Sequence, residues 1–265
     1  MPKLGQRVSS WLFEGDGLRR KILASAALST MVFVLLIISR LLSTVVLTRL
    51  LTPEIFGVFA VVMMFIFILN QFSDIGVRSL ILTKEDELDV SFLRSCWTAQ
   101  VLRGIFIFAV CSLLALGVGA LQRTGAFLPE TSYSDTALPY AIAAIGASSI
   151  ISGFASPAKF IYERDMKFRQ ISLETLIYTA IALVITIGLA LWLRSIWALV
   201  ISNFVSAVFA VFLSYVMFKG PTMRLNWSMA DFRIIIARGK WIIGQSALSA
   251  VVAVADRLIL GFVMS

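Results

Sequence analysis

The sequence predicts an all-α polytopic membrane protein, and three observations lead to this class: the hydropathy, the low charge and the length of the apolar runs. Of the 265 residues, 59% are hydrophobic and 14% are charged, and the mean hydropathy is +0.93. Soluble domains carry about 25% charged residues, and a soluble core of this size cannot enclose so much apolar surface. Several apolar runs reach the roughly 20 residues that a helix needs to cross a hydrocarbon core.

Six of these runs have spanning length, and a seventh begins near residue 240 and continues to Ser265. We therefore predict a six-helix N-terminal lobe over residues 24–218 and an incomplete seventh span over 240–265. A cytoplasmic or interfacial segment, 1–23, precedes the lobe, and a cytoplasmic interfacial linker, 219–239, follows it. The six predicted spans are residues 24–48, 55–79, 98–121, 138–158, 171–193 and 196–218.

The basic residues gather on one side of the predicted spans. Of the 23 Lys and Arg residues, eighteen lie in the N-terminal segment or around the connections after spans two, four and six, and three lie on the other side: Arg49, Arg123 and Arg194. The positive-inside rule then places the N-terminus in the cytoplasm. The formal net charge of +8 is thus a topology signal that attracts anionic headgroups, and it predicts membrane lipids rather than nucleic acid as partners.

The residue types exclude several chemistries. The chain has no histidine, which excludes histidine acid–base catalysis, Ser-His triads and imidazole metal sites. The two cysteines, Cys96 and Cys111, form no CxxC motif, so we expect no thiolate metal site. The N-terminal segment has no apolar stretch of signal-peptide length, so no cleavable signal peptide is expected. We therefore expect no metal, no cofactor and no enzymatic activity.

Two arginines lie deep in predicted spans. Arg40 and Arg257 are each about sixteen residues into a span that runs outward, which places both roughly 24 Å from the inner boundary. A guanidinium that faces a cavity at this depth can hold a phosphate in a bidentate way. Snorkelling to the outer headgroups, or a structural ion pair, is the alternative. Asp256 is adjacent to Arg257, and because neighbouring helix positions do not face each other, we expect it to pair with another helix.

Other polar residues lie nearer the ends of the spans. Asp74 and Arg78 are four residues apart near the inner end of span two. They predict an i,i+4 ion pair, and with Asp256 they are the candidate gating residues. Arg103 and Glu174 lie about one turn into their spans, where a boundary role is expected. Four amides in the spans either line a polar path or, more commonly, hydrogen-bond between helices; they are Asn70, Gln71, Asn203 and Gln245.

Small residues set span four apart, because the span is rich in Ala, Gly and Ser and has Pro157 near its inner end. Such a composition favours close helix packing. A hinge at the proline, used for alternating access, is the other interpretation.

The connections also carry helix signals. Thr52, Pro53 and Glu54 predict the start of a helix: an N-cap, a proline at the first helical position and an acid in the first turn. In the last connection, Ser228 is expected to cap a short interfacial helix that turns its apolar residues toward lipid. Those residues are Phe232, Ile235 and Ile236.

A weak internal repeat links the two deep arginines. The Arg-Leu-Leu sequence at 40–42 matches the Arg-Leu-Ile sequence at 257–259, at an offset of 217 residues. The seventh span therefore corresponds to the first. Parallel repeats of six spans are a known plan of transporters, so the chain is interpreted as one lobe plus the start of a second, repeat-related lobe.

Several stretches, in order along the chain, resemble one family. They read SRLLSTVVLTRLLTPEIFGVFAVV (39–62), FSDIGVRSLIL (72–82), ERDMKFRQISLETL (163–176), WALVISNFVSAVF (197–209) and ADRLILG (255–261). The RLLTPEIFG segment is the most specific of them. Together they are similar to the O-antigen and exopolysaccharide (oligosaccharide) flippases of the multidrug/oligosaccharidyl-lipid/polysaccharide exporter superfamily.

This resemblance implies two lobes around a central cationic cavity, so that the present sequence is expected to be a truncated chain. It implies translocation of undecaprenyl-diphosphate-linked oligosaccharide repeat units across the bacterial inner membrane for surface polysaccharide biosynthesis. Polymerase and chain-length proteins of the same pathway are the further partners it implies. The positions that match the family's substrate-binding arginines are Arg40, Arg257 and Arg49.

Two other functions remain open from the sequence. One is the membrane subunit of an ABC-type polysaccharide exporter, which fits six spans and a cytoplasmic N-terminus. The other is a drug exporter of the same superfamily, for which acidic groups rather than arginines are expected deep in the spans. A membrane enzyme such as a sugar ligase is the least favoured class, since the chain lacks histidine.

Overall fold

The protein is entirely helical over the residues that its computed structural model describes, which are 16–84, 88–125 and 133–263. Side chains are described from residue 28 onward within these ranges, except at 243, 247 and 250–263. The helices are α2 (Asp16–Leu50), α3 (Pro53–Phe72), α4 (Val77–Thr83), α5 (Val90–Arg123), α6 (Leu138–Gly153), α7 (Ala158–Arg164), α8 (Phe168–Leu193), α9 (Ile196–Met217) and α10 (Met229–Val263).

Most of these helices are long and apolar enough to cross a membrane. Five segments qualify by length and composition, and the bent pair of α6 and α7 makes a sixth within the described part of the chain. The chain is therefore a multi-pass membrane protein of the all-α class, as its composition predicts. The expected seventh span, 240–265, lies mostly in α10, where side chains beyond residue 249 are outside the described residues.

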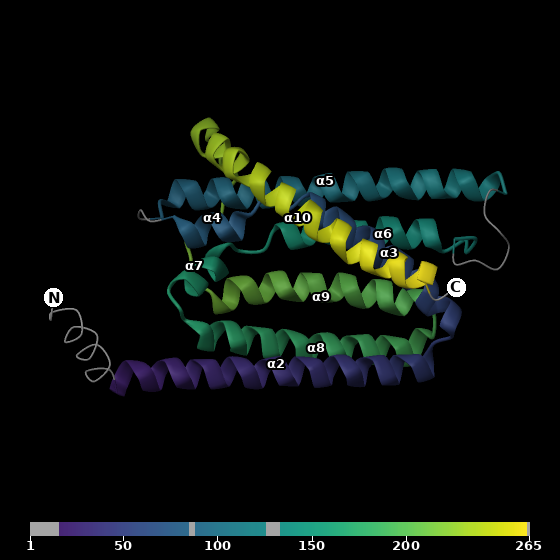
Figure 1. The fold of residues 1–265 in the computed structure, drawn as a ribbon, viewed down its shortest axis with the longest axis horizontal. Coiled ribbons are helices and arrows are strands. Elements are labelled where there is room, and N and C mark those ends of the chain that lie inside the picture. Colours follow the sequence, from purple (N-terminus) through teal and green to yellow (C-terminus); the bar gives the residue numbers. More distant parts are fainter. Residues whose placement is uncertain (1–15, 85–87, 126–132, 264–265) are drawn as a thin grey trace.

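The helices run back and forth along one long axis (Figure 1). The connections from α2 to α3, from α5 to α6 and from α8 to α9 lie at one end of the bundle. The start of α2, the helices α4 and α7, and the connection from α9 to α10 lie at the other end. This second end therefore holds the connections in which the sequence gathers its basic residues, and we call it the basic end.

Tight turns join the helices at the opposite end. Pro53 begins α3 after an extended Thr52, as the sequence predicts, although the Thr52 side chain makes no capping hydrogen bond. Between α8 and α9, Arg194 adopts a left-handed conformation with φ of 44°. The Ser195 hydroxyl then accepts a hydrogen bond from the Trp197 backbone N–H at 3.3 Å and caps α9. Two residues thus suffice to reverse the chain.

Span two is not one continuous helix. Residues 55–79 were expected as a single span, but α3 ends at Phe72 and α4 resumes at Val77. Gly76 has a positive φ of 66°, which glycine adopts without steric cost. The Asp74 carboxylate accepts a hydrogen bond from the Gly76 backbone N–H at 2.9 Å, and this bond fixes the turn.

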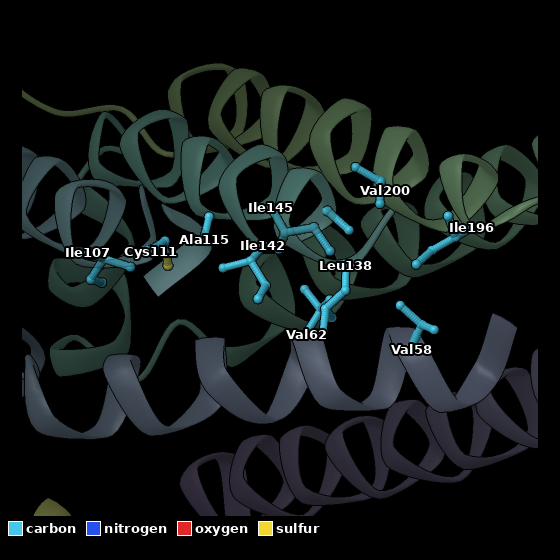
Figure 2. Packing of buried hydrophobic residues seen from close by; sticks show 11 residues of the cluster. Val58, Val62, Ile107, Cys111, Ala115, Leu138, Ile142, Ile145, Ile196 and Val200 are labelled. Carbon is cyan, nitrogen blue, oxygen red and sulfur yellow. The ribbon is translucent and has the colours of Figure 1, made fainter. Parts of the chain in front are cut away.

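The interior of the lobe is where α3, α5, α6 and α9 meet (Figure 2). At the edge of this group, α2 packs against α8, while α10 crosses α3 and α5 (Figure 1). In a membrane, such contacts are stabilised by van der Waals packing more than by the hydrophobic effect. The buried members of this core are Val58, Val62, Ile107, Cys111, Ala115, Leu138, Ala141, Ile142, Ile145, Ile196 and Val200.

Close packing is what the small residues of span four provide. A Cβ built on Gly153 would lie 2.9 Å from the Gln100 carbonyl oxygen, and one on Gly146 would lie 2.5 Å from the Cys111 Cβ. From the α5 side, a Cβ on Gly104 would meet the Ser149 carbonyl oxygen. The helices α5 and α6 therefore approach almost to backbone contact. The chain also bends by 63° between α6 and α7, at the break that ends with Pro157.

The linker into α10 differs from the expected short interfacial helix. The Ser228 hydroxyl does accept from the Asp231 backbone N–H at 3.3 Å, but α10 continues without a break from Met229 to Val263. Ile235 was expected to face lipid and is instead 1% exposed. It packs in a cluster with Phe92 and Leu93 of α5, because the start of α10 lies across α4 and α5. Of the three apolar residues expected to face lipid, Ile236 is exposed and Phe232 is half-buried.

The α5–α6 contact predicts unequal effects of two glycine substitutions in the same helix. Gly104→Ala is expected to lower the free energy of unfolding by about 1–3 kcal/mol, because its Cβ overlaps a backbone oxygen that cannot rotate away. Gly117→Ala, which has no atom within 4 Å of its Cβ, is expected to be neutral or to stabilise by up to about 1 kcal/mol through helix propensity. Unfolding in mixed micelles measures both, and equal effects would contradict the packing.

Candidate functional site

Two of the predicted substrate-binding arginines lie on the outer surface of α2. Arg40 and Arg49 are both exposed, and neither forms an ion pair among the described residues. Around Arg40, the side chains of Leu41 and Leu42 are also exposed, at 62% and 51%. The guanidinium of Arg40 thus projects from a bare apolar face of the helix.

The third predicted arginine lies in α10, where its backbone is helical. The side chains of Arg257 and Asp256 are outside the described residues. The main packing partner of α2 is α8, whereas α10 packs against α3, α4 and α5. The described part of the chain therefore does not bring Arg40 and Arg257 to one site, and a shared phosphate site stays a prediction.

The expected ion pair between Asp74 and Arg78 is wrong. Arg78 makes a two-pronged contact with Glu163 of α7, in which its Nε donates to Oε2 at 2.9 Å and its Nη2 donates to Oε1. The i,i+4 spacing requires a continuous helix, and Asp74 lies in the turn between α3 and α4. Its carboxylate is instead held by Gly76 and acts electrostatically on Arg103.

Further polar contacts tie the helices together at the basic end. Lys159 of α7 pairs with the buried Glu174 of α8 at 2.7 Å. Arg94 of α5 donates through its Nε to the backbone carbonyl of Thr222 at 3.1 Å. With the Arg78–Glu163 pair, these contacts join α4, α5, α7, α8 and the segment before α10. Glu174 thus has a partner near the start of α8, and its boundary role stays a prediction.

Arg103 lines a polar cavity within the lobe, and the boundary role expected of it stays a prediction. The cavity has a volume of about 230 Å³ and lies between α3, α5, α6 and α9. Apolar side chains, including Ile66, Ile107 and Ile145, form part of its wall. Its polar lining consists of Asn70, Gln100, Arg103, Ser148, Ser149, Ser152 and Asn203.

Hydrogen bonds to neutral groups hold Arg103 in place. Its Nε donates to the Ser73 hydroxyl at 3.2 Å, and its Nη2 donates to the backbone and side-chain oxygens of Asn70 at 3.1 and 3.0 Å. On the other side of the cavity, the Ser148 hydroxyl lies 3.0 Å from the Asn203 Oδ1. Both asparagines therefore hydrogen-bond between helices and also line the cavity, so the two interpretations open from the sequence apply together.

Four polar members of the cavity were not singled out from the sequence: Gln100, Ser148, Ser149 and Ser152. A signal was present, because Gln100, Arg103 and Gly104 follow the i, i+3, i+4 spacing of one helix face. The Gln100 Oε1 is buried and has no hydrogen-bond partner among the described residues. Neither Gln71 nor Gln245 lines this cavity.

The Arg78–Glu163 contact predicts a measurable coupling between α4 and α7. In a double-mutant cycle with Arg78→Ala and Glu163→Ala, we expect a coupling free energy of about 0.5–1 kcal/mol, since Arg78 is largely exposed. The matched control is the cycle of Arg78→Ala with Asp74→Ala, for which the coupling is expected to be close to zero. Unfolding in mixed micelles measures both, and a larger coupling to Asp74 would refute the pairing.

Comparison with known proteins addresses the family of the chain. No curated protein and no solved structure matches it. The family model described as polysaccharide biosynthesis protein matches residues 46–265. This range contains Arg49, Arg103 and Arg257, and it begins six residues after Arg40. Because the match covers most of the sequence, the chain belongs to the polysaccharide biosynthesis protein family.

Proposed function

We propose that this chain translocates undecaprenyl-diphosphate-linked oligosaccharide repeat units across the bacterial inner membrane for O-antigen or exopolysaccharide synthesis. The observation that carries the proposal is membership of the polysaccharide biosynthesis family in a multi-pass helical chain. A lipid-linked sugar has to carry its polar headgroup through hydrocarbon, where unpaired charge is costly. Moving it breaks no bond, so we propose a flippase rather than an enzyme, and one that works without a cofactor.

The surface of α2 supports a role for Arg40 in holding the diphosphate. Arg40 lies ten residues before the end of α2, which is about 15 Å along the helix axis. It is exposed next to exposed leucines, and lipid tails offer no hydrogen-bond acceptor to a guanidinium. A diphosphate offers several oxygens in the geometry that suits a bidentate contact.

We propose that this face of α2 borders a cavity shared with further helices. Arg257 is the second proposed ligand of the diphosphate, from a span that the sequence relates to the first. Arg49, in the last turn of α2, is the third, at the proposed outer end. A cationic cavity of this kind would hold an anionic headgroup while the lipid tail remains in the bilayer.

The orientation of the chain is part of this proposal, with the basic end and the N-terminus in the cytoplasm. The test uses cysteines introduced at two exposed positions, Lys219→Cys at the basic end and Thr124→Cys at the opposite end. Both native cysteines are buried, so they give little background. In cells with a permeabilised outer membrane, a membrane-impermeant maleimide is expected to label Thr124→Cys only. Preferential labelling of Lys219→Cys would invert the proposed topology.

The role of Arg40 predicts a loss of polysaccharide export on substitution. In a strain whose only copy of the gene encodes Arg40→Ala, we expect surface polysaccharide to fall at least about tenfold, because the diphosphate loses a charged hydrogen-bonding partner. Arg40→Lys keeps the charge but loses the bidentate fork, so an intermediate level is expected. Export is measured on intact cells, and protein level by immunoblot of membranes.

The matched control is Arg123→Ala, which removes an exposed arginine at the outer end of α5 and should leave export unchanged. Accumulation of lipid-linked oligosaccharide in the Arg40→Ala strain would place the defect at translocation rather than at synthesis. Full export by Arg40→Ala at normal protein level would refute the role of this residue.

A further inference from the structure

The structure assigns a small-anion site to the polar cavity around Arg103, and we propose that it takes a monovalent inorganic anion of the halide type. This inference does not depend on the proposed flippase activity. It rests on the charge of the cavity, on the polar groups in it that the protein leaves unpaired, and on its size.

The charge of Arg103 is the first argument. All groups that accept a hydrogen bond from it are neutral: the Ser73 hydroxyl and the two oxygens of Asn70. No carboxylate lies within 4 Å of it among the described residues. Asp74 acts on it only through space and is itself bonded to Gly76. A half-buried cation in a membrane protein without a contacting anion favours binding of one.

The unpaired groups are the second argument. The hydrogen bonds of Arg103 use its Nε and Nη2, and the described part of the chain provides no acceptor for its Nη1. The Ser148 hydroxyl donates to the Ile145 carbonyl at 2.7 Å and lies 3.0 Å from the Asn203 Oδ1, and the described residues provide no acceptor for the amide N–H groups of Asn203. The Ser149 hydroxyl lines the cavity without a described partner. These groups come from three helices, α5, α6 and α9, and all can donate to one anion.

Gln100 completes the set. Its Oε1 is buried at the cavity without a hydrogen-bond partner among the described residues, an arrangement that costs free energy in the empty cavity. The oxygen and nitrogen of a glutamine amide exchange places by rotation about the last side-chain bond. An anion cannot pair with this oxygen itself, so Gln100 contributes a donor only in the rotated state, with its amide nitrogen turned toward the cavity.

The size of the cavity decides the class of anion. A volume of about 230 Å³ is below the roughly 300–1,000 Å³ of sites for organic ligands. It accommodates a small inorganic anion with some water but not a sugar diphosphate. One cation in direct contact and otherwise neutral donors favour a single negative charge. Chloride, with its spherical shape, can accept from all these directions at once.

The experiment compares the purified chain in potassium chloride and in potassium gluconate at equal ionic strength. We expect the unfolding temperature to rise with chloride along a saturating curve, because a ligand of the folded state stabilises it. Equilibrium binding of radiolabelled chloride, at one ion per chain, is the direct measure. A chain that unfolds at the same temperature in both salts, with no bound label, would overturn the proposal.

Variants separate the site from a general salt effect. Ser149→Ala should weaken chloride binding about tenfold, because the variant loses one hydrogen bond to the charged ligand. The matched control is Ser112→Ala in α5, since the Ser112 hydroxyl donates to the Phe108 carbonyl at 2.9 Å and does not line the cavity, so the chloride affinity should stay unchanged. Arg103→Gln should abolish binding. If that variant does not fold, the two serine variants still test the site. Equal chloride affinities in both of them would refute it.

Discussion

The close approach of α5 and α6 is the contact on which the rest of the lobe depends. Glycines at 104, 146 and 153 remove the side chains that would otherwise hold the two helices apart. Because the backbones nearly touch, Gln100 and Arg103 of α5 lie opposite the serines of α6. The same contact buries Cys111 and Ala115 against α6 and builds the apolar core. One interface thus sets both the packing and the polar cavity.

Arg103 shows how such an interface accommodates a charge. A guanidinium inside a membrane protein is costly unless its donors are paired, and three groups on α3 and its C-terminal turn accept hydrogen bonds from Arg103. Ser73 and Asn70 lie there because α3 ends at Phe72, which leaves backbone oxygens free to accept. The break in span two is therefore a source of acceptors for Arg103 as well as a turn. The donors that remain point to a ligand.

Hydropathy was sufficient to predict the class of fold and the approximate position of the helices, because spanning length and apolar composition are local properties. The continuity of α10 was not predictable in this way, since it depends on tertiary contacts, and the break at 73–76 was missed because its local signal, Asp74 and Gly76, does not interrupt the hydropathy of the span. Ile235 illustrates the difference: its sequence context is amphipathic, yet α5 covers it. A boundary role was expected of Arg103 because it lies about one turn after the predicted start of span three, at residue 98. The helix itself begins earlier, at Val90, so that Arg103 lies almost four turns into α5.

The two arginines that the repeat relates lie on helices with different neighbours. Arg40 projects from α2 on a face that α8 leaves bare, whereas α10 packs against α3, α4 and α5. Two guanidiniums on helices with different neighbours can share one diphosphate only if further helices, or a second lobe, enclose the space that both faces border. The proposed transport site is thus a property of an assembly larger than the described lobe. The Arg103 cavity, by contrast, is lined by residues of four helices within this lobe. An anion bound there would hold α3, α5, α6 and α9 together as a rigid unit. A lobe that moves without internal rearrangement requires such rigidity.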